Sequence, residues 1–187
     1  MNLIDRLLAV DRVLMRKLTL ARRHELPPRL AHPAKARVAV WIATFLAHSG
    51  DSVIWLLIGS AALLWGAPGW RRAGIRILLG NLGGGQVTGV LKFLVRRQRP
   101  SAQDRALYHA HDRHSFPSGH AGRFACSVTL VWAMLPLWSR PLVLLWGLAI
   151  GWARVGLQAH YVSDVLAGWL VGWLAGLLAD EAARIAF

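Results

Sequence analysis

The residues best suited to chemistry form three short groups between residues 92 and 164. Imidazole exchanges a proton near neutral pH and can also act as a nucleophile. Lysine and arginine side chains carry positive charges that bind phosphate oxygens. The groups are Lys92 with Arg99, the run Phe116-Pro117-Ser118-Gly119-His120, and Arg154 with His160 and Asp164. Three cations without matching acids predict an anionic ligand, and phosphate fits.

The central group has the composition of a helix start. Pro117, a hydroxyl and a glycine precede an apolar run over residues 121–135. Ser118 is expected to cap this helix, and Gly119 allows a ligand to approach the backbone closely. A helix start presents unpaired N–H groups that suit phosphate, and His120 would place an imidazole beside it.

The other two groups are expected to lie on helices. His160 and Asp164 are one turn apart, so the carboxylate is expected to hold the imidazole by a hydrogen bond. Lys92 and Arg99 are two turns apart, which would place both on one helix face. Each group alone also fits an ordinary structural role, such as a lysine that reaches the membrane interface. Together, at one membrane surface, they favour a functional site.

Small residues continue the stripes on which these polar side chains lie. Gly147 and Gly151 share a face with Arg154, and Gly168, Gly172 and Gly176 follow Asp164. Stripes of this kind allow helices to pack closely in lipid.

The composition indicates a membrane protein. Of 187 residues, 55% are hydrophobic and ten are tryptophan, and several apolar runs approach the roughly 20 residues that cross a bilayer. The net charge is +13, but the basic residues border apolar runs and contain no nucleic-acid motif. Anionic lipid or phosphate is therefore the expected partner, not nucleic acid. The single cysteine, Cys126, excludes an internal disulfide and is expected to be buried.

The apolar runs predict an all-α fold, a polytopic membrane helix bundle of about five transmembrane helices plus an N-terminal amphipathic helix. Residues 1–37 form the basic N-terminal segment and residues 38–187 the membrane-embedded domain. The polar segments 96–120 and 154–164 are expected at the same surface. A short helix to about residue 48 precedes the crossings, which are expected over residues 52–65, 73–95, 121–135, 142–155 and 162–178, the last closed by Asp180-Glu181.

The first apolar pattern is amphipathic. Leucine or valine recurs at helical spacing over residues 2–25, with arginines between, and Pro27-Pro28 ends the pattern. This predicts a helix in the membrane interface, although a helix packed on the domain stays open. No secretory signal is evident. Asp51 interrupts a later apolar stretch and is expected to cap the helix that follows.

The three groups resemble the signature of the type 2 phosphatidic acid phosphatase family, which is related to vanadium haloperoxidases. The third block commonly begins Ser-Arg, and Ala153 here replaces the serine. The helices around the blocks extend the resemblance from about residue 50, whereas the first 37 residues match nothing. The matching pattern is Lys92-x6-Arg99-Pro100, Pro117-Ser118-Gly119-His120 and Arg154-x5-His160-x3-Asp164.

The resemblance implies a lipid phosphatase that needs no metal or cofactor. His160 would attack phosphorus to form a phosphohistidine, and Asp164 would orient it. His120 would protonate the leaving oxygen and then activate water. The phosphoryl oxygens would be bound by Lys92, Arg99, Arg154, Ser118 and the N–H of Gly119. Candidate substrates are undecaprenyl diphosphate, phosphatidic acid, phosphatidylglycerol phosphate and a lipid A-type glycolipid.

Two other function classes stay open. A vanadate-dependent haloperoxidase would share the anion site, but the apolar runs argue against it. A non-catalytic carrier or channel for lipid phosphates would not need two histidines and a carboxylate. The basic segment 1–37 favours a cytoplasmic N-terminus, whereas the resemblance favours a bacterial inner-membrane protein whose site faces outward.

Several polar residues near the three groups are expected to have ordinary roles. Arg96, Arg97 and Tyr161 are interpreted as interfacial anchors, and Arg123 is left outside the core set. A loop cluster resembles a metal site, but a solvated loop beside an anion site explains it more simply. The cluster consists of His109, His111, His114 and Asp112.

Overall fold

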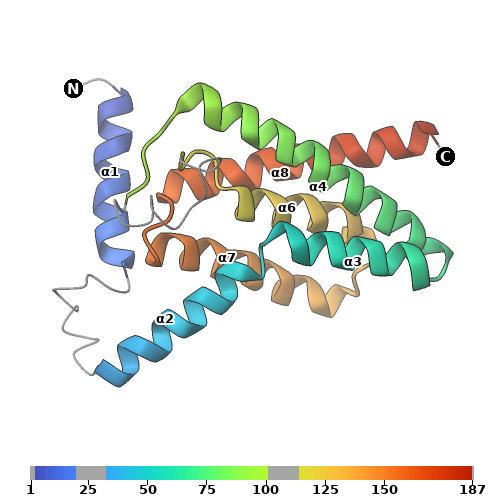
Figure 1. Ribbon diagram of the computed structural model, residues 1–187, viewed down its shortest axis with the longest axis horizontal. Helices are drawn as coiled ribbons and strands as arrows, with labels where there is room; N and C mark the ends of the chain where they lie inside the picture. The colour runs from blue at the N-terminus through green and yellow to red at the C-terminus, as the bar shows by residue number, and fades with distance from the viewer. Residues whose placement is uncertain (1–2, 20–32, 101–113, 187) are drawn as a thin grey trace.

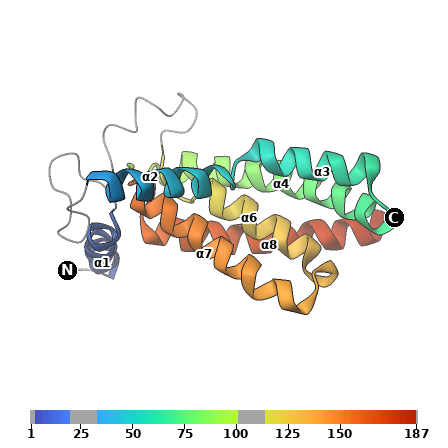
Figure 2. The same ribbon diagram turned by 90° about the horizontal axis from the view of Figure 1, so that it is seen from below.

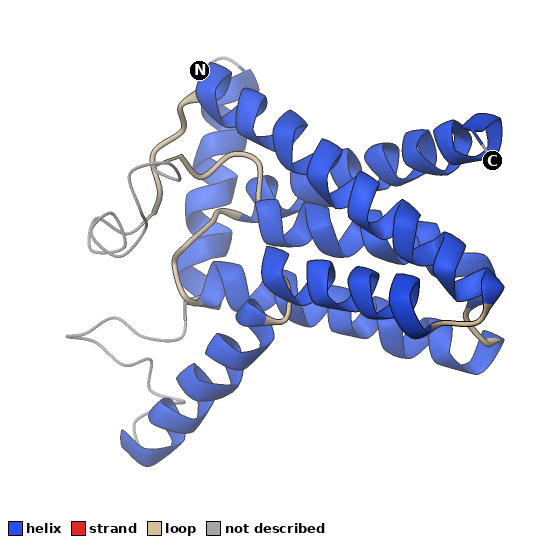
Figure 3. Cartoon of the chain, turned by 45° about the vertical axis from the view of Figure 1, so that its right-hand side comes forward, coloured by secondary structure: helices blue, strands red, loops and turns tan. Residues whose placement is uncertain are grey.

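The computed structural model describes residues 3–19, 33–100 and 114–186. Within these residues the regular structure is helical and the only bridge is an isolated one between Gln98 and His114, which confirms the all-α prediction (Figure 3). The helices are α1 (Leu3–Leu18), α2 (Pro33–His48), α3 (Ser52–Trp65), α4 (Pro68–Val95), α6 (Gly119–Val131), α7 (Arg140–Gly156) and α8 (Val162–Ala186), with 3-10 turns η2 (Trp132–Met134) and η3 (Leu137–Ser139).

Helices α3, α4, α6, α7 and α8 form an elongated bundle (Figure 1). The closest packing joins α6 to α8, and α4 lies against α3, α6 and α8. α1 runs across one end of the bundle, where α4 ends and α8 begins, and Figure 2 shows it almost along its own axis. Residues far apart in the sequence therefore meet at this end.

The packing of α6 on α8 depends on glycine. A methyl group at Gly172 would overlap the backbone carbonyl of Gly122, and one at Gly168 would overlap that of Ser118. Only glycine lets two helix backbones approach this closely. The predicted small-residue stripe on α8 is confirmed.

A polar contact ties α4 to α6 inside the bundle. The amide of Asn81 donates a hydrogen bond of 2.8 Å to Ser127 Oγ, and both side chains are buried. A buried polar group needs such a partner, because an unpaired one would cost free energy on folding. Cys126, next to Ser127, is buried as predicted.

Helix bounds differ from the predictions at several ends. Residues 20–25 and Pro27-Pro28 lie outside the described residues. α8 does not close at Asp180-Glu181 but continues to Ala186, so that prediction is wrong. Asp180 accepts from Arg76 of α4 at 2.6 Å and from Arg184 of the next turn at 2.7 Å. Paired in this way, the acidic residue stabilises the helix.

One described helix, over Val162–Arg184, is long and apolar enough to cross a membrane. The segments Arg37–His48 and Ser52–Trp65 pass the same test together but are bent by 49°. α3, α6 and α7 have 14, 13 and 17 residues, which is short for a crossing. The expected number of crossings therefore stays a prediction.

Candidate active site

Three segments converge at the end of the bundle that α1 covers. The N–H of Ser118, before α6, donates to the backbone oxygen of Asp164 in α8 at 2.8 Å. Arg99, after α4, donates to the carbonyl of Ala159 at 2.8 Å. The polar segments expected at the same surface are thus in contact with each other.

His160 lies at the centre of this region and is 1% exposed. Its Nδ1–H donates to the backbone carbonyl of Ser115 at 2.7 Å. This leaves a lone pair on Nε2, to which Arg99 Nη1 donates at 3.4 Å. Burial, and then the charges of Arg154, Arg99 and Lys92, hold the pKa of His160 well below its usual range. The imidazole is therefore neutral and surrounded by cations.

Asp164 does not make the expected hydrogen bond to His160. Its Oδ2 lies 3.8 Å from Nδ1, beyond hydrogen-bond range. Since α8 begins at Val162, His160 precedes the helix and is not one turn from Asp164. The carboxylate instead accepts from the Tyr161 N–H at 2.9 Å and from Arg97 at 2.7 Å. It closes the first turn of α8 in the manner of a capping box.

His120 is the second residue of α6, and its partner is Asp51. The Nε2–H of His120 donates to Asp51 Oδ1, and the other carboxylate oxygen accepts from His48 at 2.7 Å. Asp51 stands at the N-cap position of α3 but makes no capping hydrogen bond. The predicted cap is therefore wrong, because two imidazoles occupy the carboxylate. An acidic residue within an apolar stretch was the signal for this contact.

The predicted phosphate ligands surround the two histidines. Arg99 and Arg154 are 3% and 4% exposed. Lys92 lies in the last turn of α4, but Arg99 is not on that helix, so the predicted shared face is wrong. The helix ends at Val95, because Arg96 adopts a left-handed conformation with φ of 50°. Arg99 therefore reaches His160 from the loop.

Ser118 and Gly119 begin α6 beside these cations. Ser118 occupies the N-cap position, but its side chain makes no capping bond, contrary to the prediction. Its hydroxyl is fully buried and has no hydrogen-bond partner among the described residues. A buried hydroxyl without a partner at a helix start is available to a ligand.

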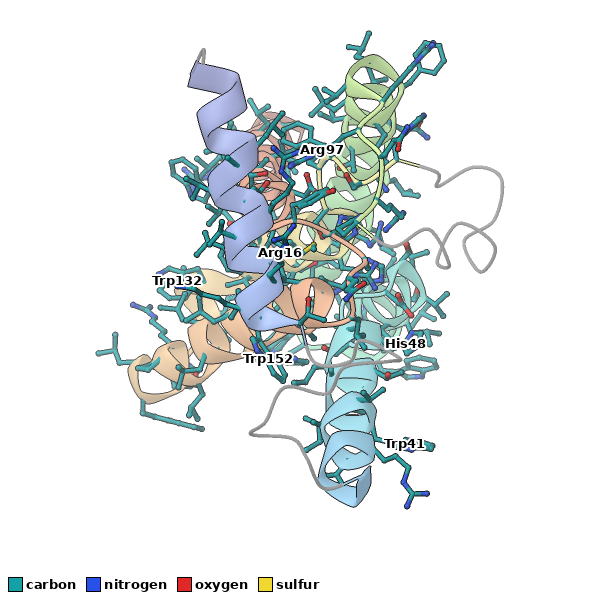
Figure 4. All side chains as sticks on the ribbon, turned by 90° about the vertical axis from the view of Figure 1, so that its left-hand side faces the viewer. Arg16, Trp41, His48, Arg97, Trp132 and Trp152 are labelled. Atoms are coloured by element: carbon teal, nitrogen blue, oxygen red, sulfur yellow. The ribbon has the colours of Figure 1, made fainter. Side chains whose placement is uncertain are left out.

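Arg97 is not the interfacial anchor that was predicted. Its guanidinium donates to Asp164 and to Ser163 Oγ at 2.7 and 2.6 Å, and to Asp11 at 2.6 Å. It also lies over the ring of Tyr161, 4.0 Å from the centroid. Figure 4 shows Arg97 beside α1 at the end of α4. Spacing in the sequence gave no signal for these contacts.

The remaining residues have peripheral positions. Arg96 is exposed and lies over the ring of Phe93, 4.6 Å from the centroid. Arg123 donates to the carbonyl of Gly50 at 3.3 Å, one turn below His120. Of the loop cluster, His114 bridges Gln98, whereas His109, His111 and Asp112 lie outside the described residues.

Comparisons with known proteins find similar sequences over most of this chain. A model of the PAP2 superfamily matches residues 73–182. YbjG of Escherichia coli, a candidate undecaprenyl-diphosphatase, is 30% identical over 143 residues, which cover 75% of this chain and 71% of that protein. Decaprenylphosphoryl-5-phosphoribose phosphatase of Mycolicibacterium smegmatis is 33% identical over 128 residues, which cover 67% of this chain and 69% of that protein.

The fold is also similar to a solved structure. A transmembrane PAP2 type phosphatidylglycerolphosphate phosphatase from Bacillus subtilis superposes on this chain with a TM-score of 0.70 at 24% identity. The match covers 96% of this chain and 87% of that chain. Because the family model spans more than half of the sequence, including all three groups of polar residues, the chain belongs to the PAP2 superfamily.

Proposed function

We propose that this phosphate hydrolase removes the terminal phosphate of a lipid phosphate or diphosphate through a phosphohistidine. One observation carries the proposal. His160 is buried and neutral, its Nδ1–H is bound to a carbonyl, and its Nε2 lone pair lies among buried cations. Such a nitrogen is a nucleophile for an anionic phosphorus centre, because the cations neutralise the repulsion that the phosphoryl oxygens would otherwise cause.

In the first step, Nε2 of His160 forms a bond to phosphorus while the bond from phosphorus to the lipid oxygen breaks. His120 gives a proton to that oxygen. Because its Nε2–H is bound to Asp51, Nδ1 of His120 carries the exchanged proton. In the second step, His120 takes a proton from water, the hydroxide attacks phosphorus, and inorganic phosphate leaves His160.

Fixed groups stabilise the charges that develop. Lys92, Arg99 and Arg154 bind the phosphoryl oxygens, and the Ser118 hydroxyl and the Gly119 N–H donate further hydrogen bonds. Asp164, 3.8 Å from Nδ1 of His160, stabilises the positive charge of the phosphohistidine. These residues need no metal ion for this chemistry.

An apolar cavity supports a lipid as the substrate. It has a volume of about 670 Å³ and lies between α6, α7 and α8. Its lining includes Phe124, Leu148, Trp169 and Trp173. Phe124 follows His120 by about one turn of α6, so a tail in the cavity would place its phosphate near the histidines.

Within the lipid phosphates, we place polyprenyl phosphates and diphosphates first. The two relatives described above carry names that refer to polyprenyl-linked compounds. Phosphatidylglycerol phosphate is the second candidate, because the Bacillus subtilis protein of the same fold is named as a phosphatidylglycerolphosphate phosphatase. Phosphatidic acid and lipid A-type phosphates complete the panel that should be tested.

We further propose that the protein spans the bacterial inner membrane. α3, α4, α6, α7 and α8 would cross, with α7 at the lower limit of length and α3 and α6 shorter than it. The site end, with α1 across it, would lie at the outer surface. A basic first segment favours the opposite orientation, and the reactivity of single cysteines on either side of the membrane distinguishes the two.

The test is phosphate release by the purified full-length protein from this panel, with EDTA present. The wild-type protein should release phosphate from at least one lipid, and His160→Asn should abolish release. His120→Asn should leave a phosphoenzyme that can be trapped with a substrate that has a good leaving group. Glu181→Gln, which changes an exposed acid remote from the site, is the control.

Three outcomes would contradict parts of the proposal. Full turnover by His160→Asn would exclude the phosphohistidine. Loss of wild-type activity in EDTA would show that a metal ion is required. Halide oxidation with added vanadate, in place of phosphate release, would indicate a haloperoxidase.

A further inference from the structure

Helix α1 reaches the active site through one buried carboxylate. Asp11 is 4% exposed, although Arg12 and Arg16 of the same helix are exposed. The Ser163 N–H donates to Asp11 Oδ1 at 3.1 Å, and the Ser163 hydroxyl donates to Oδ2. A buried carboxylate is costly unless it is paired, so these contacts are strong determinants of where α1 docks.

The second partner of Asp11 is Arg97. Nη2 of Arg97 donates to Asp11 at 2.6 Å, while Nη1 of the same guanidinium donates to Asp164 at 2.7 Å. The ring of Tyr161 covers the guanidinium face. The planar fork of arginine fixes the direction of its hydrogen bonds, so two carboxylates on opposite arms hold it in one orientation.

We propose that Asp11 is a positioning residue, which fixes Arg97 and through it Asp164, so that α1 is a working part of the active site. The inference rests on the proposed function, in which Asp164 stabilises the positive phosphohistidine. It concerns a residue outside the segment that matches the family, residues 73–182.

The charge balance gives the physical reason. Two carboxylates and one guanidinium, from Asp11, Asp164 and Arg97, leave one negative charge beside His160. Without the charge of Asp11, Arg97 would neutralise Asp164 alone. The carboxylate would then offer less stabilisation to a phosphohistidine that is positively charged, and the phosphoryl-transfer step would slow.

The alternative is that Asp11 has a purely structural role, and the test must distinguish this role from the positioning of Arg97 and Asp164. Met15, one turn further along α1, packs against the cluster of Ala121, Val155 and Val165. Met15→Ala should loosen the docking of α1 without removing a charge. It therefore serves as a control matched for lost stability, compared by thermal unfolding of the purified full-length protein.

The experiment compares Asp11→Asn, Asp11→Glu, Arg97→Lys and Met15→Ala in phosphate release from the best lipid of the panel. Asp11→Asn should lower kcat by about 10- to 100-fold, the range found for groups that orient metal-binding side chains, with little change in KM. Asp11→Glu should restore part of kcat. Arg97→Lys combined with Asp11→Asn should be no worse than the more impaired single variant, because both break one chain of contacts.

Three results would overturn the inference. The first is wild-type kcat in Asp11→Asn. The second is a loss of kcat in the double variant that equals the product of the losses in the two single variants. The third is an equal loss of kcat in Met15→Ala at equal loss of thermal stability. His160→Asn is measured in the same series, so an inactive His160→Asn beside a fully active Asp11→Asn would reject only this inference. An active His160→Asn would reject the proposed function itself.

Discussion

The chemistry of the site depends on which nitrogen of each histidine is already bound. In His160, Nδ1–H donates a hydrogen bond to the backbone carbonyl of Ser115, and Nε2 therefore lies toward Arg99 with its lone pair available. In His120, Nε2–H donates a hydrogen bond to the carboxylate of Asp51. The two imidazoles therefore differ in environment: one is bound by a neutral acceptor among cations, and the other is paired with an acid.

The lowered pKa of His160 predicts an acid sensitivity of the fold. The unfolded chain binds a proton on this histidine below its ordinary pKa of 6.5, whereas the folded protein does not. Stability contributed by the neutral imidazole is thus present above that pH and is lost as the pH falls below it. His160→Asn removes the group, so its melting temperature should fall less than that of the wild type on acidification. Equal losses, measured by thermal unfolding in detergent, would contradict the prediction.

Removal of the Asp51 charge should change the pH profile of the reaction. The carboxylate accepts a hydrogen bond from His120 and favours its protonated form, which the first step needs. In Asp51→Asn, the fall of kcat on the alkaline side should therefore move to lower pH. The loss at neutral pH should stay within the roughly 10²–10⁴-fold range of general acid catalysis. An unshifted profile would show that Asp51 has no part in proton transfer.

The residue types of the site followed from the sequence, but their partners did not. The two histidines and the cations belong to the three groups whose residue types and spacing predicted the site. Asp51 lies 69 positions from His120, and Asp11 lies 152 from Ser163. The acceptor for His160 is a backbone carbonyl, which residue identity does not reveal. Local spacing reports contacts within one helix and carries no information about contacts between distant segments.

At the scale of elements, the α6–α8 contact decides where the histidines stand. The seam of Gly168 and Gly172 against α6 sets how far the start of α6 lies from the start of α8. The periodicity of small residues predicted that seam. The crossing expected over residues 73–95 ends where α4 ends, at Val95. The two-turn spacing of Lys92 and Arg99 wrongly extended that helix past Arg96, whose backbone adopts a conformation that non-glycine residues seldom adopt.

Two glycine substitutions should have opposite effects on stability. In Gly172→Ala the new methyl group would overlap the backbone of Gly122, so the free energy of unfolding should fall by about 1–3 kcal/mol. Gly89 in α4 has open space at the same position, and Gly89→Ala should stabilise its helix by up to about 1 kcal/mol. Thermal unfolding of both variants is the measurement. Equal behaviour would mean that the seam does not constrain the bundle.

At the scale of the whole molecule, the residues of the candidate site gather at one end of the bundle, where α4 ends and α8 begins. α1 lies across the polar end with Arg12, Arg16 and Lys17 on its exposed side, together with Val10, Leu14 and Leu18. This orientation fits the predicted interfacial helix, whose cations would contact anionic headgroups. The sequence left open whether such a helix also packs on the domain, and the structure shows that it does.

The membrane orientation can be measured with single cysteines. The native Cys126 is buried and should not react with an impermeant thiol reagent in intact cells. If the site faces outward, Arg105→Cys should react and Trp70→Cys, at the opposite end of α4, should be protected. The reverse pattern would place the site in the cytoplasm and agree with the basic N-terminal segment.

The glycine seam has a consequence for anyone who maps this protein by random substitution. Sliding α8 along α6 by even a fraction of a turn would misalign Ser118 and Asp164, whose backbones are joined by a hydrogen bond. A screen scored only by turnover would therefore mark the buried glycines of the α6–α8 contact as if they bound phosphate. A parallel score of protein abundance would separate these scaffold positions from the side chains that carry out hydrolysis.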